Sequence, residues 1–268
     1  MTLNQEPRKG FTLVELAIVL VIIGLLIGGI LAAQSMIATS RIVAVAAQIQ
    51  QFDAGVENFK TKYNYLPGDA PAFGGNGNGI IAWTAFAGGA LNQTYALNCE
   101  IGNFWNNIKP EEYTGSICTW PGVQAIPTGP NKNVPAAKLG KAGSFFIASA
   151  MSLGNTYADT ANVRNFYAIL EGSQGQTNIG FYNFIATTSS NSAVRPIDLL
   201  SLDKKIDYGI GNTGDVLSGN LTPSTNAGIF LSPLGTCSNS ATGVYSIANT
   251  GYTCTPLIRI GAQAGDPQ

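Results

Sequence analysis

The feature that most constrains this chain is an apolar run close to its N-terminus. Residues from Leu16 to Ala33 are all apolar or glycine, and no charged residue occurs between Leu16 and Ser40. A stretch of that length meets the criterion for a helix that spans a membrane. Glu15 stands directly before the run, and a carboxylate at such a position is costly unless it has a partner. The chain is therefore predicted to enter a bilayer near its N-terminus, with an acid that needs a cationic partner.

The residues in front of the run form a specific motif. They read Lys9-Gly10-Phe11-Thr12-Leu13-Val14-Glu15-Leu16. This motif resembles the processing signal of type IV prepilins and type II secretion pseudopilins. In that family a short basic leader is removed after the glycine, the new first residue is N-methylated, and the glutamate is retained. The resemblance implies cleavage between Gly10 and Phe11, methylation of Phe11, and an assembly role for Glu15.

The chemistry of the cleaved end agrees with this resemblance. Cleavage after Gly10 creates a positive amine on Phe11, and the Glu15 carboxylate lies about one helical turn away. That carboxylate can neutralise the amine of its own chain or of a neighbouring chain. The family pairing is the intermolecular one, in which Glu15 sets the register of an incoming subunit. The residues themselves leave both pairings open.

Two simpler interpretations of the same segment were considered. A secretory signal peptide also has a basic start and an apolar run, and Ala33 to Ser35 offers a weak cleavage site. A plain signal anchor would share the basic residues Arg8 and Lys9 on the cytoplasmic side. Neither accounts for Glu15 or for the motif that precedes it, so the prepilin interpretation is preferred.

Composition excludes several classes of function. The formal net charge is −1 and charged residues make up 11% of the chain, so no basic face for nucleic acid is expected. The chain contains no histidine, which excludes histidine-based triads and histidine metal sites. No nucleophile-elbow, Ser-x-x-Lys or phosphate-loop motif occurs. We therefore expect a protein that is not an enzyme.

The four cysteines all follow the apolar run. They are Cys99, Cys118, Cys237 and Cys254. An even number of cysteines in a domain exported to an oxidising compartment indicates disulfides. Of the three connectivities, we favour the local one, Cys99 with Cys118 and Cys237 with Cys254. Each bridge would contribute about 3 kcal/mol by restricting the unfolded chain.

The helix is expected to continue beyond the apolar run as far as Tyr65. An apolar residue recurs every three or four positions, which places one stripe on one face of a helix. The stripe consists of Ile42, Val45, Ile49, Phe52, Val56, Phe59 and Tyr63. Pro67 and Gly68 end the helix. Within the run, Gly24 and Gly28 have the spacing that lets helices approach closely in lipid.

The remainder of the chain is rich in turns, with short segments of regular structure. The resemblance to prepilins extends only loosely past residue 70. A loop is expected over 72–79, helices over 100–108 and 196–206, and a turn over 134–140. Strands are expected over 144–148, 166–170, 179–186, 244–248 and 256–260, with 166–170 and 179–186 forming an antiparallel pair.

One acidic segment was assessed as a metal site. Asp203, Asp207 and Asp215 lie close together in the sequence, and Asn212 and Thr213 add further oxygens. Calcium takes about six to eight oxygen ligands, and some pseudopilins bind it in a C-terminal loop. The spacing here matches no calcium loop that we can name, so helix capping by Asp203 and a turn at Asp215 are favoured. We expect no cofactor, with calcium at these aspartates as the alternative.

The predicted fold is α+β and pilin-like: a long N-terminal helix packed on a small antiparallel sheet, with a loop-rich, disulfide-bonded head. The expected parts are a cleaved leader (1–10), a transmembrane and assembly half of the helix (11–36), an amphipathic half (37–66) and an extracytoplasmic head (67–268).

The resemblance implies a subunit of a type IV pilus-like filament, homo-oligomeric or mixed. Its implied partners are a prepilin peptidase and methyltransferase, an inner-membrane platform, an assembly ATPase and the membrane. The subunit would cross the inner membrane once, with its head in the periplasm, before joining a periplasmic or cell-surface filament. The alternatives are a minor tip pilin or pseudopilin that acts as adhesin, DNA receptor or secretion component, and a signal-anchored periplasmic enzyme.

Overall fold

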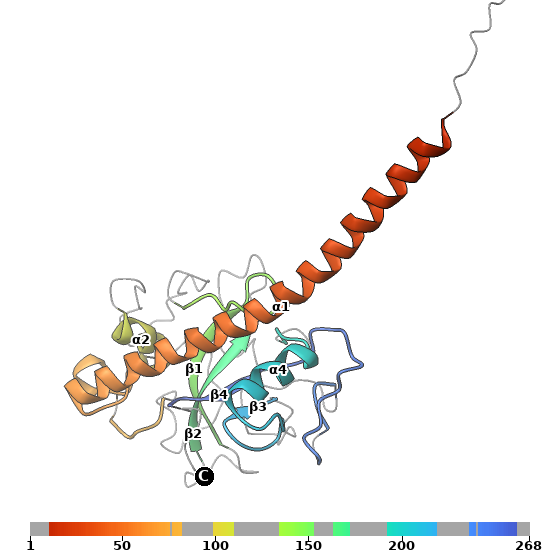
Figure 1. Cartoon of the computed structure of the whole chain (residues 1–268). Helices are drawn as coiled ribbons and strands as arrows, with labels where there is room; N and C mark the ends of the chain where they lie inside the picture. Colours follow the sequence, from red (N-terminus) through yellow and green to blue (C-terminus); the bar gives the residue numbers. More distant parts are fainter. Residues whose placement is uncertain are drawn as a thin grey trace, which may run out of the picture. The chain divides into compact units, whose positions relative to one another are not determined.

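The computed structural model describes residues 11–75, 77–81, 99–109, 134–152, 163–171, 192–218, 236–239 and 241–261. The chain divides into two compact units, Met1–Arg41 and Ile42–Gln268. The architecture is α+β, with one long N-terminal helix and a small antiparallel sheet (Figure 1). A disulfide joins Cys237 to Cys254. The predicted fold class is confirmed.

Helix α1 spans Leu13–Tyr63, 51 residues, so it is two residues shorter at each end than predicted. Its end is set by Asn64, which has a left-handed φ of 60° and donates its N–H to the carbonyl of Lys60 at 2.7 Å. Asparagine tolerates this conformation better than most side chains and ends helices in this way. Pro67 thus follows the end of the helix and does not set it.

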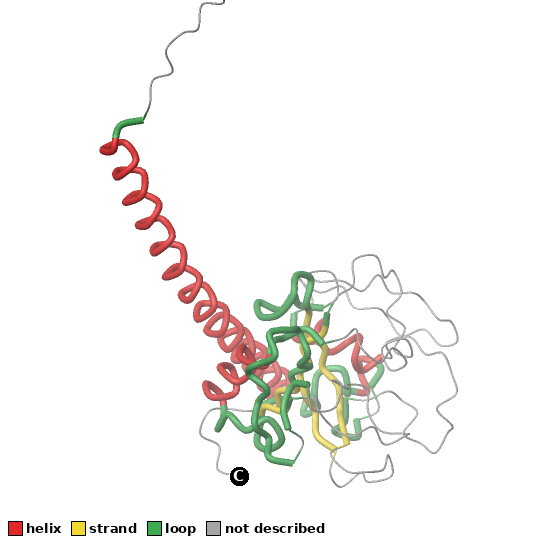
Figure 2. Tube along the Cα trace, turned by 90° about the vertical axis from the view of Figure 1, so that its right-hand side faces the viewer, coloured by secondary structure: helices red, strands yellow, loops and turns green. Residues whose placement is uncertain are grey.

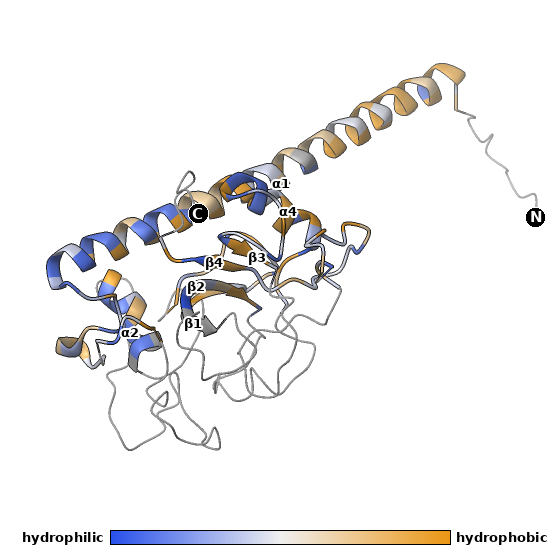
Figure 3. Cartoon of the chain, turned by 90° about the horizontal axis from the view of Figure 1, so that it is seen from below, coloured by the Kyte–Doolittle hydropathy of each residue, from blue (hydrophilic) through white to orange (hydrophobic). Residues whose placement is uncertain are grey.

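The predicted apolar stripe of α1 is confirmed in the second unit. Six members are buried: Ile42, Val45, Ile49, Phe52, Val56 and Phe59. Tyr63, at the end of the stripe, is half-buried. The hydropathy colours of Figure 3 show hydrophilic residues alternating with apolar ones over this part of α1, as expected for a helix with one buried face.

An aromatic cluster joins α1 to the rest of the second unit. The Phe52 ring lies 4.7 Å from Trp105, 5.2 Å from Phe146 and 5.8 Å from Tyr167, measured between ring centroids. Trp105 belongs to α2 (Cys99–Ile108), which agrees with the helix predicted there. Both Trp105 and its neighbour Phe104 are fully buried. These contacts fix the amphipathic half of α1 on the core.

The sheet has four strands, β1 (Phe145–Ser152), β2 (Val163–Leu170), β3 (Val216–Leu217) and β4 (Leu257–Arg259). Their order is β1-β2-β4-β3, and all neighbours are antiparallel. The strands are drawn in yellow in Figure 2. The last strand of the sequence therefore lies inside the sheet. The predicted strands 144–148, 166–170 and 256–260 are confirmed.

In the described sheet, β2 pairs with β1 and β4 and not with the predicted partner 179–186. Residues 166–168 pair with β1 on one side and with β4 on the other, so both of their edges are occupied. The segment 179–186 lies outside the described residues. Strand order depends on contacts far apart in the sequence, which local alternation does not encode.

Helix α4 spans Pro196–Ile206, with the bounds that were predicted. Pro196 opens it at the first helical position, where its missing N–H costs nothing. Leu199 and Leu202 are fully buried, whereas Lys204 and Lys205 are exposed. Leu200 and Ile206 are half-buried and pack against the core, so these side chains of α4 also face inward.

The predicted strand over 244–248 is wrong. Only Tyr245 forms a bridge there, with Ser238, and the flanking Val244 and Ile247 are exposed. Asn249 donates its N–H to the carbonyl of Ser246, which closes a turn directly after Tyr245. The alternation of apolar residues resembled a strand, but turn hydrogen bonds determine the local structure.

The Cys237–Cys254 disulfide is confirmed, with 5.0 Å between the Cα atoms. The backbone of Cys254 forms an isolated β-bridge with Val194, two residues before α4 begins. Cys118 lies outside the described residues, so the bridge between Cys99 and Cys118 stays a prediction.

Asp69 organises the glycine-rich loop that was predicted after α1. Its buried carboxylate accepts the N–H groups of Gly77, Asn78 and Gly79 at 2.8, 3.1 and 2.8 Å. A short 3-10 helix, η1 (Pro71–Phe73), precedes these turns. A single side chain thereby holds a loop that has few apolar residues of its own.

Candidate functional site

The start of α1 is closed by a reciprocal pair of side chains. The Thr12 N–H and hydroxyl each donate to Oε2 of Glu15 at 2.9 Å. In return, the Glu15 N–H donates to Oγ1 of Thr12 at 3.2 Å. This arrangement is a capping box, which satisfies backbone donors that the first turn of a helix leaves free. Glu15 therefore has a local partner within its own chain.

The capping box leaves part of the carboxylate available. Both Thr12 and Glu15 are exposed, and no described residue donates to the other oxygen, Oε1. Phe11, the residue that would carry the new amine, is 89% exposed. Gly10 lies outside the described residues. A carboxylate that is held in place and still open on one side can accept a cation from another molecule.

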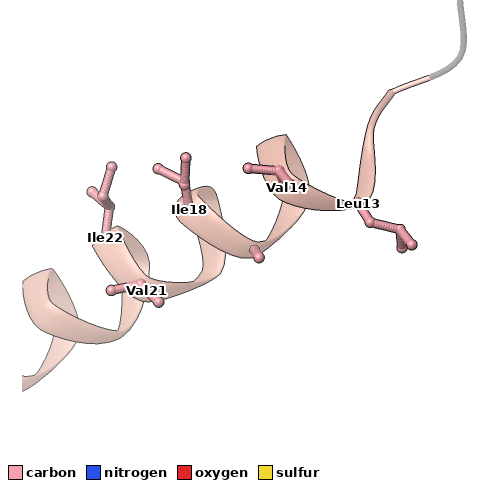
Figure 4. Close-up of a pocket in the computed structure, with 6 residues that line it drawn as sticks. Leu13, Val14, Ile18, Val21 and Ile22 are labelled. Atoms are coloured by element: carbon pink, nitrogen blue, oxygen red, sulfur yellow. The ribbon is translucent and has the colours of Figure 1, made fainter.

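An apolar groove lies on the first turns of α1, the same turns that carry Glu15. It is lined by Leu13, Val14, Ala17, Ile18, Val21 and Ile22, five of which are labelled in Figure 4. The large side chains from Leu13 to Ile37 are exposed in the first unit. By length and composition α1 can cross a membrane, and no residue of its most apolar window is buried. This surface requires lipid or another apolar partner.

Gly24 and Gly28 leave open space on the same segment. A Cβ atom added at either position would meet nothing within 4 Å. They are one helical turn apart and, since they carry no side chain, a second helix can approach their backbone closely. This geometry is compatible with their predicted role in assembly.

The three aspartates considered for calcium have partners among the described residues. The Asp207 carboxylate accepts the N–H of Asp215 at 2.6 Å, and Asp215 pairs with Arg259, with 2.6 Å between Oδ1 and Nε. Asp203 accepts the N–H of Gly209 at 3.1 Å. Over the described ranges, no group of three or more acidic or cysteine side chains is placed to hold a metal ion. Asp203 does not act as an N-terminal cap, since it lies inside α4.

Asp203 forms a buried pair with Tyr245. The Tyr245 hydroxyl donates to Oδ2 of Asp203 at 2.6 Å, and both side chains are buried. Burial raises the pKa of Asp203 from 3.8 to about 6, although both hydrogen bonds oppose this change. Burial also raises the pKa of Tyr245, and the charge of Asp203 adds to that rise. The pair attaches α4 to the disulfide-bounded loop.

A second buried pair attaches α1 to the sheet. Oδ1 of Asp53 accepts the Tyr167 hydroxyl at 3.0 Å and the N–H of Gly261 at 2.9 Å. Burial raises the pKa of Tyr167. Asp53 thus connects α1 to β2 and to the residues after β4, as Asp203 connects α4 to the disulfide-bounded loop.

Sequence reasoning missed several of these residues. Thr12 could have been found, because a threonine three positions before a glutamate at the start of an apolar run is the signature of a capping box. Asp53, Asp69 and Asp203 gave no comparable signal, because their partners are distant in the sequence or are backbone groups.

The comparison with protein families supports the N-terminal assignment. Residues 7–31 match the family model described as prokaryotic N-terminal methylation motif. The match includes the predicted cleavage site after Gly10 and most of the apolar run. Neither the curated proteins nor the solved structures gave a match to the chain.

Proposed function

We propose that this chain, which carries the type IV prepilin and pseudopilin signal at residues 7–31, is a structural subunit of a type IV pilus-like filament. The proposal rests on the part of α1 that lies in the first unit, from Leu13 to Arg41. This part combines a processing signal, an exposed apolar surface and a single carboxylate at its start. The signal needs a processing enzyme, the apolar surface needs lipid or another helix, and the carboxylate needs a cation.

Processing would occur at the peptide bond between Gly10 and Phe11. A prepilin peptidase hydrolyses this bond, which leaves a new amine on Phe11, and a methyl group is then transferred to that amine. Phe11 is exposed and precedes Leu13, the first residue of α1, so the Phe11 side of the bond lies outside the helix and suits access by such an enzyme. The activity lies with the processing enzyme; the chain itself is proposed to be non-enzymatic.

Assembly would use the same segment after cleavage. Oε1 of Glu15 is open, so the Phe11 amine of a neighbouring subunit can bind there while Thr12 keeps Oε2 in place. A charge-assisted hydrogen bond of this kind gains strength in a surrounding of low dielectric constant. The apolar groove on the first turns of α1 and the open backbone at Gly24 and Gly28 would receive apolar side chains of the neighbour.

Leaving the membrane requires work from other proteins. Lipid tails are as apolar as these side chains, so the hydrophobic effect does not favour extraction. A filament core replaces lipid by neighbouring helices, which avoids exposing the run to water. We propose that an assembly ATPase and an inner-membrane platform supply this work. The head would wait in the periplasm until then.

The decisive experiment replaces Glu15 by alanine. We expect Glu15→Ala to insert in the membrane and to be processed, but to enter filaments at least tenfold less than the wild type. The matched control is Glu57→Ala, an exposed glutamate of the same helix whose contact is an ion pair with Lys60. Sheared filaments and membranes are quantified by immunoblot. Normal filaments from Glu15→Ala would contradict the assigned role.

The processing step has its own test. Gly10→Val should block cleavage, so that the precursor accumulates in the membrane. Mass spectrometry of the wild-type protein should show an N-terminal methylated Phe11. A mature wild-type protein that retains Met1, or that begins near Ser35, would overturn the proposal.

A minor tip subunit is the second candidate. The head is long, and its described surface exposes Tyr208, Val244 and Ile247, with exposed fractions of 75, 66 and 55%. Exposed apolar side chains of this kind suit an adhesin, a DNA receptor or a secretion component. The amount of the protein in sheared filaments separates the two, because a major subunit dominates and a tip subunit is present in trace.

A further inference from the structure

We propose that Arg41 binds the phosphate groups of lipids at the outer surface of the inner membrane, and that this contact sets the depth of α1 in the bilayer. The inference rests on the proposed membrane-held subunit and adds a lipid-binding residue to it. It names the outer boundary of the membrane segment, as Glu15 marks the inner one.

Arg41 is isolated as a charge. Between Glu15 and Asp53 it is the one ionisable residue of the sequence. Its side chain is exposed, and the ion pairs found among the described residues do not include it. An arginine that the described part of the chain leaves without a counter-ion is available to an external anion.

The position of Arg41 matches the thickness of a bilayer. The apolar run from Leu16 to Ala33 is about 27 Å long at about 1.5 Å per residue, close to the hydrocarbon thickness of about 30 Å. The next residues up to Arg41 include Gln34, Thr39 and Ser40 and cover about 12 Å more. The interfacial layer is about 5–8 Å thick on each side of a bilayer, so the backbone of Arg41 lies just outside it. Side chains of a helix point toward its N-terminus, so the long Arg41 side chain reaches back to the headgroups.

The chemistry of the side chain favours phosphate as its partner. A guanidinium group donates two parallel hydrogen bonds to phosphate oxygens, and its long stem can lie along apolar surface while the charge stays at the interface. The first buried residue of the second unit is Ile42, directly after Arg41. The cation therefore stands at the last position before side chains turn to the protein core.

Relocating the charge tests the inference. The double variant Gln34→Arg/Arg41→Gln moves the cation by seven residues on nearly the same helix face, since seven residues are about two turns. If the arginine stays with the headgroups, the helix must slide outward by up to about 10 Å. A fluorophore on Leu20→Cys, which is exposed, would then move from the inner leaflet toward the bilayer centre.

The measurement uses the processed full-length protein in vesicles of phosphatidylethanolamine and phosphatidylglycerol, with lipids that carry nitroxide quenchers at known depths. We expect the double variant to shift the depth of the fluorophore by several ångströms, up to about 10 Å. Two controls should keep the wild-type depth: Arg41→Lys, which keeps a cation, and Gln34→Asn, which adds none.

An unchanged depth in the relocated variant would overturn the lipid contact. If that variant also lost filaments, Arg41 would instead belong to a contact between subunits. Failure of the proposed function looks different, because a wild-type chain that alkaline carbonate extracts from membranes is not a membrane-held subunit at all.

Discussion

The two parts of α1 have the same backbone structure but different surroundings. From Leu13 to Arg41 the large side chains are exposed in every direction, whereas from Ile42 onward one stripe is buried and the opposite face is polar. The apolar side chains of the second part are buried by its own chain. The large apolar side chains of the first part are left exposed by the described residues, and their sequence predicts lipid and neighbouring helices. One helix therefore combines a segment packed on the protein core with an exposed apolar segment, the one proposed for assembly.

The largest expected effect comes from a matched pair of truncations. Phe52→Ala should lower the free energy of unfolding of the second unit by about 3–5 kcal/mol, because Phe52 is 2% exposed and contacts three aromatic rings. Ile22→Ala, at a side chain that is 51% exposed, should leave that free energy unchanged. Denaturant titration in detergent, followed by the fluorescence of Trp105 and the other tryptophans, measures both. Equal losses of unfolding free energy in the two variants would contradict the difference between the two parts of α1.

The disulfide should matter to the second unit only. Replacing Cys237 and Cys254 together by serine should lower the free energy of unfolding by about 3 kcal/mol, since the bridge closes a loop with a sequence separation of 17. Membrane integration of the first unit should not change. The denaturant midpoint and carbonate extraction are measured on the same preparation. A wild-type midpoint in the double variant would show that the loop is held by its hydrogen bonds.

The Asp203 pair should give the second unit an unusual pH dependence. The pKa of Asp203 is raised from 3.8 to about 6, so between these values the native state holds a proton that the unfolded chain has released. The contribution of this group to stability is therefore full below about pH 4 and falls as pH rises to about 6, by at most about 3 kcal/mol. Thermal melts across this range compare the wild type with Asp203→Asn.

We expect Asp203→Asn to reduce that slope, because asparagine does not titrate. An identical slope in both proteins would assign the dependence to other groups, such as the buried Asp53.

Two glycines of α1 give the smallest and most specific contrast. A Cβ atom at Gly55 would overlap the Cγ2 atom of Ile108, whereas at Gly24 it would meet nothing within 4 Å. Gly55→Ala should therefore cost about 1–3 kcal/mol of stability. Gly24→Leu should leave the unfolding of the monomer unchanged and reduce filament yield, because a bulky side chain keeps a second helix away. Thermal melts and sheared-filament yields test the pair; wild-type filament yield from Gly24→Leu would remove Gly24 from the interface.

Much of this structure could be predicted from local patterns. The stripe of α1, the bounds of α4 and the Cys237–Cys254 bridge follow from periodicity, from Pro196 and from the spacing of cysteines. The sheet order and the very short β3 could not, because pairing partners lie far apart in the sequence. The error at 244–248 arose where an apolar alternation occurs among turns.

Only those parts of the candidate site whose residues are close together in the sequence were predicted. The motif around Glu15 identified the signal, and a closer reading would have added Thr12. The paired carboxylates of the second unit depend on the folded arrangement. Asp53, for example, meets Gly261 over a separation of 208 residues.

That long-range hydrogen bond has a consequence for the order in which the protein matures. In the proposed topology the N-terminus stays at the inner face and the C-terminal residues are exported last, yet β4 lies between β2 and β3 and Gly261 donates to Asp53 of α1. Loop closure over such separations is slow, and in that topology it cannot begin until the final segment has been exported. The apolar stripe from Ile42 to Phe59 would then stay uncovered throughout export, and a chaperone or protease on the outer side would encounter the nascent chain in this interval.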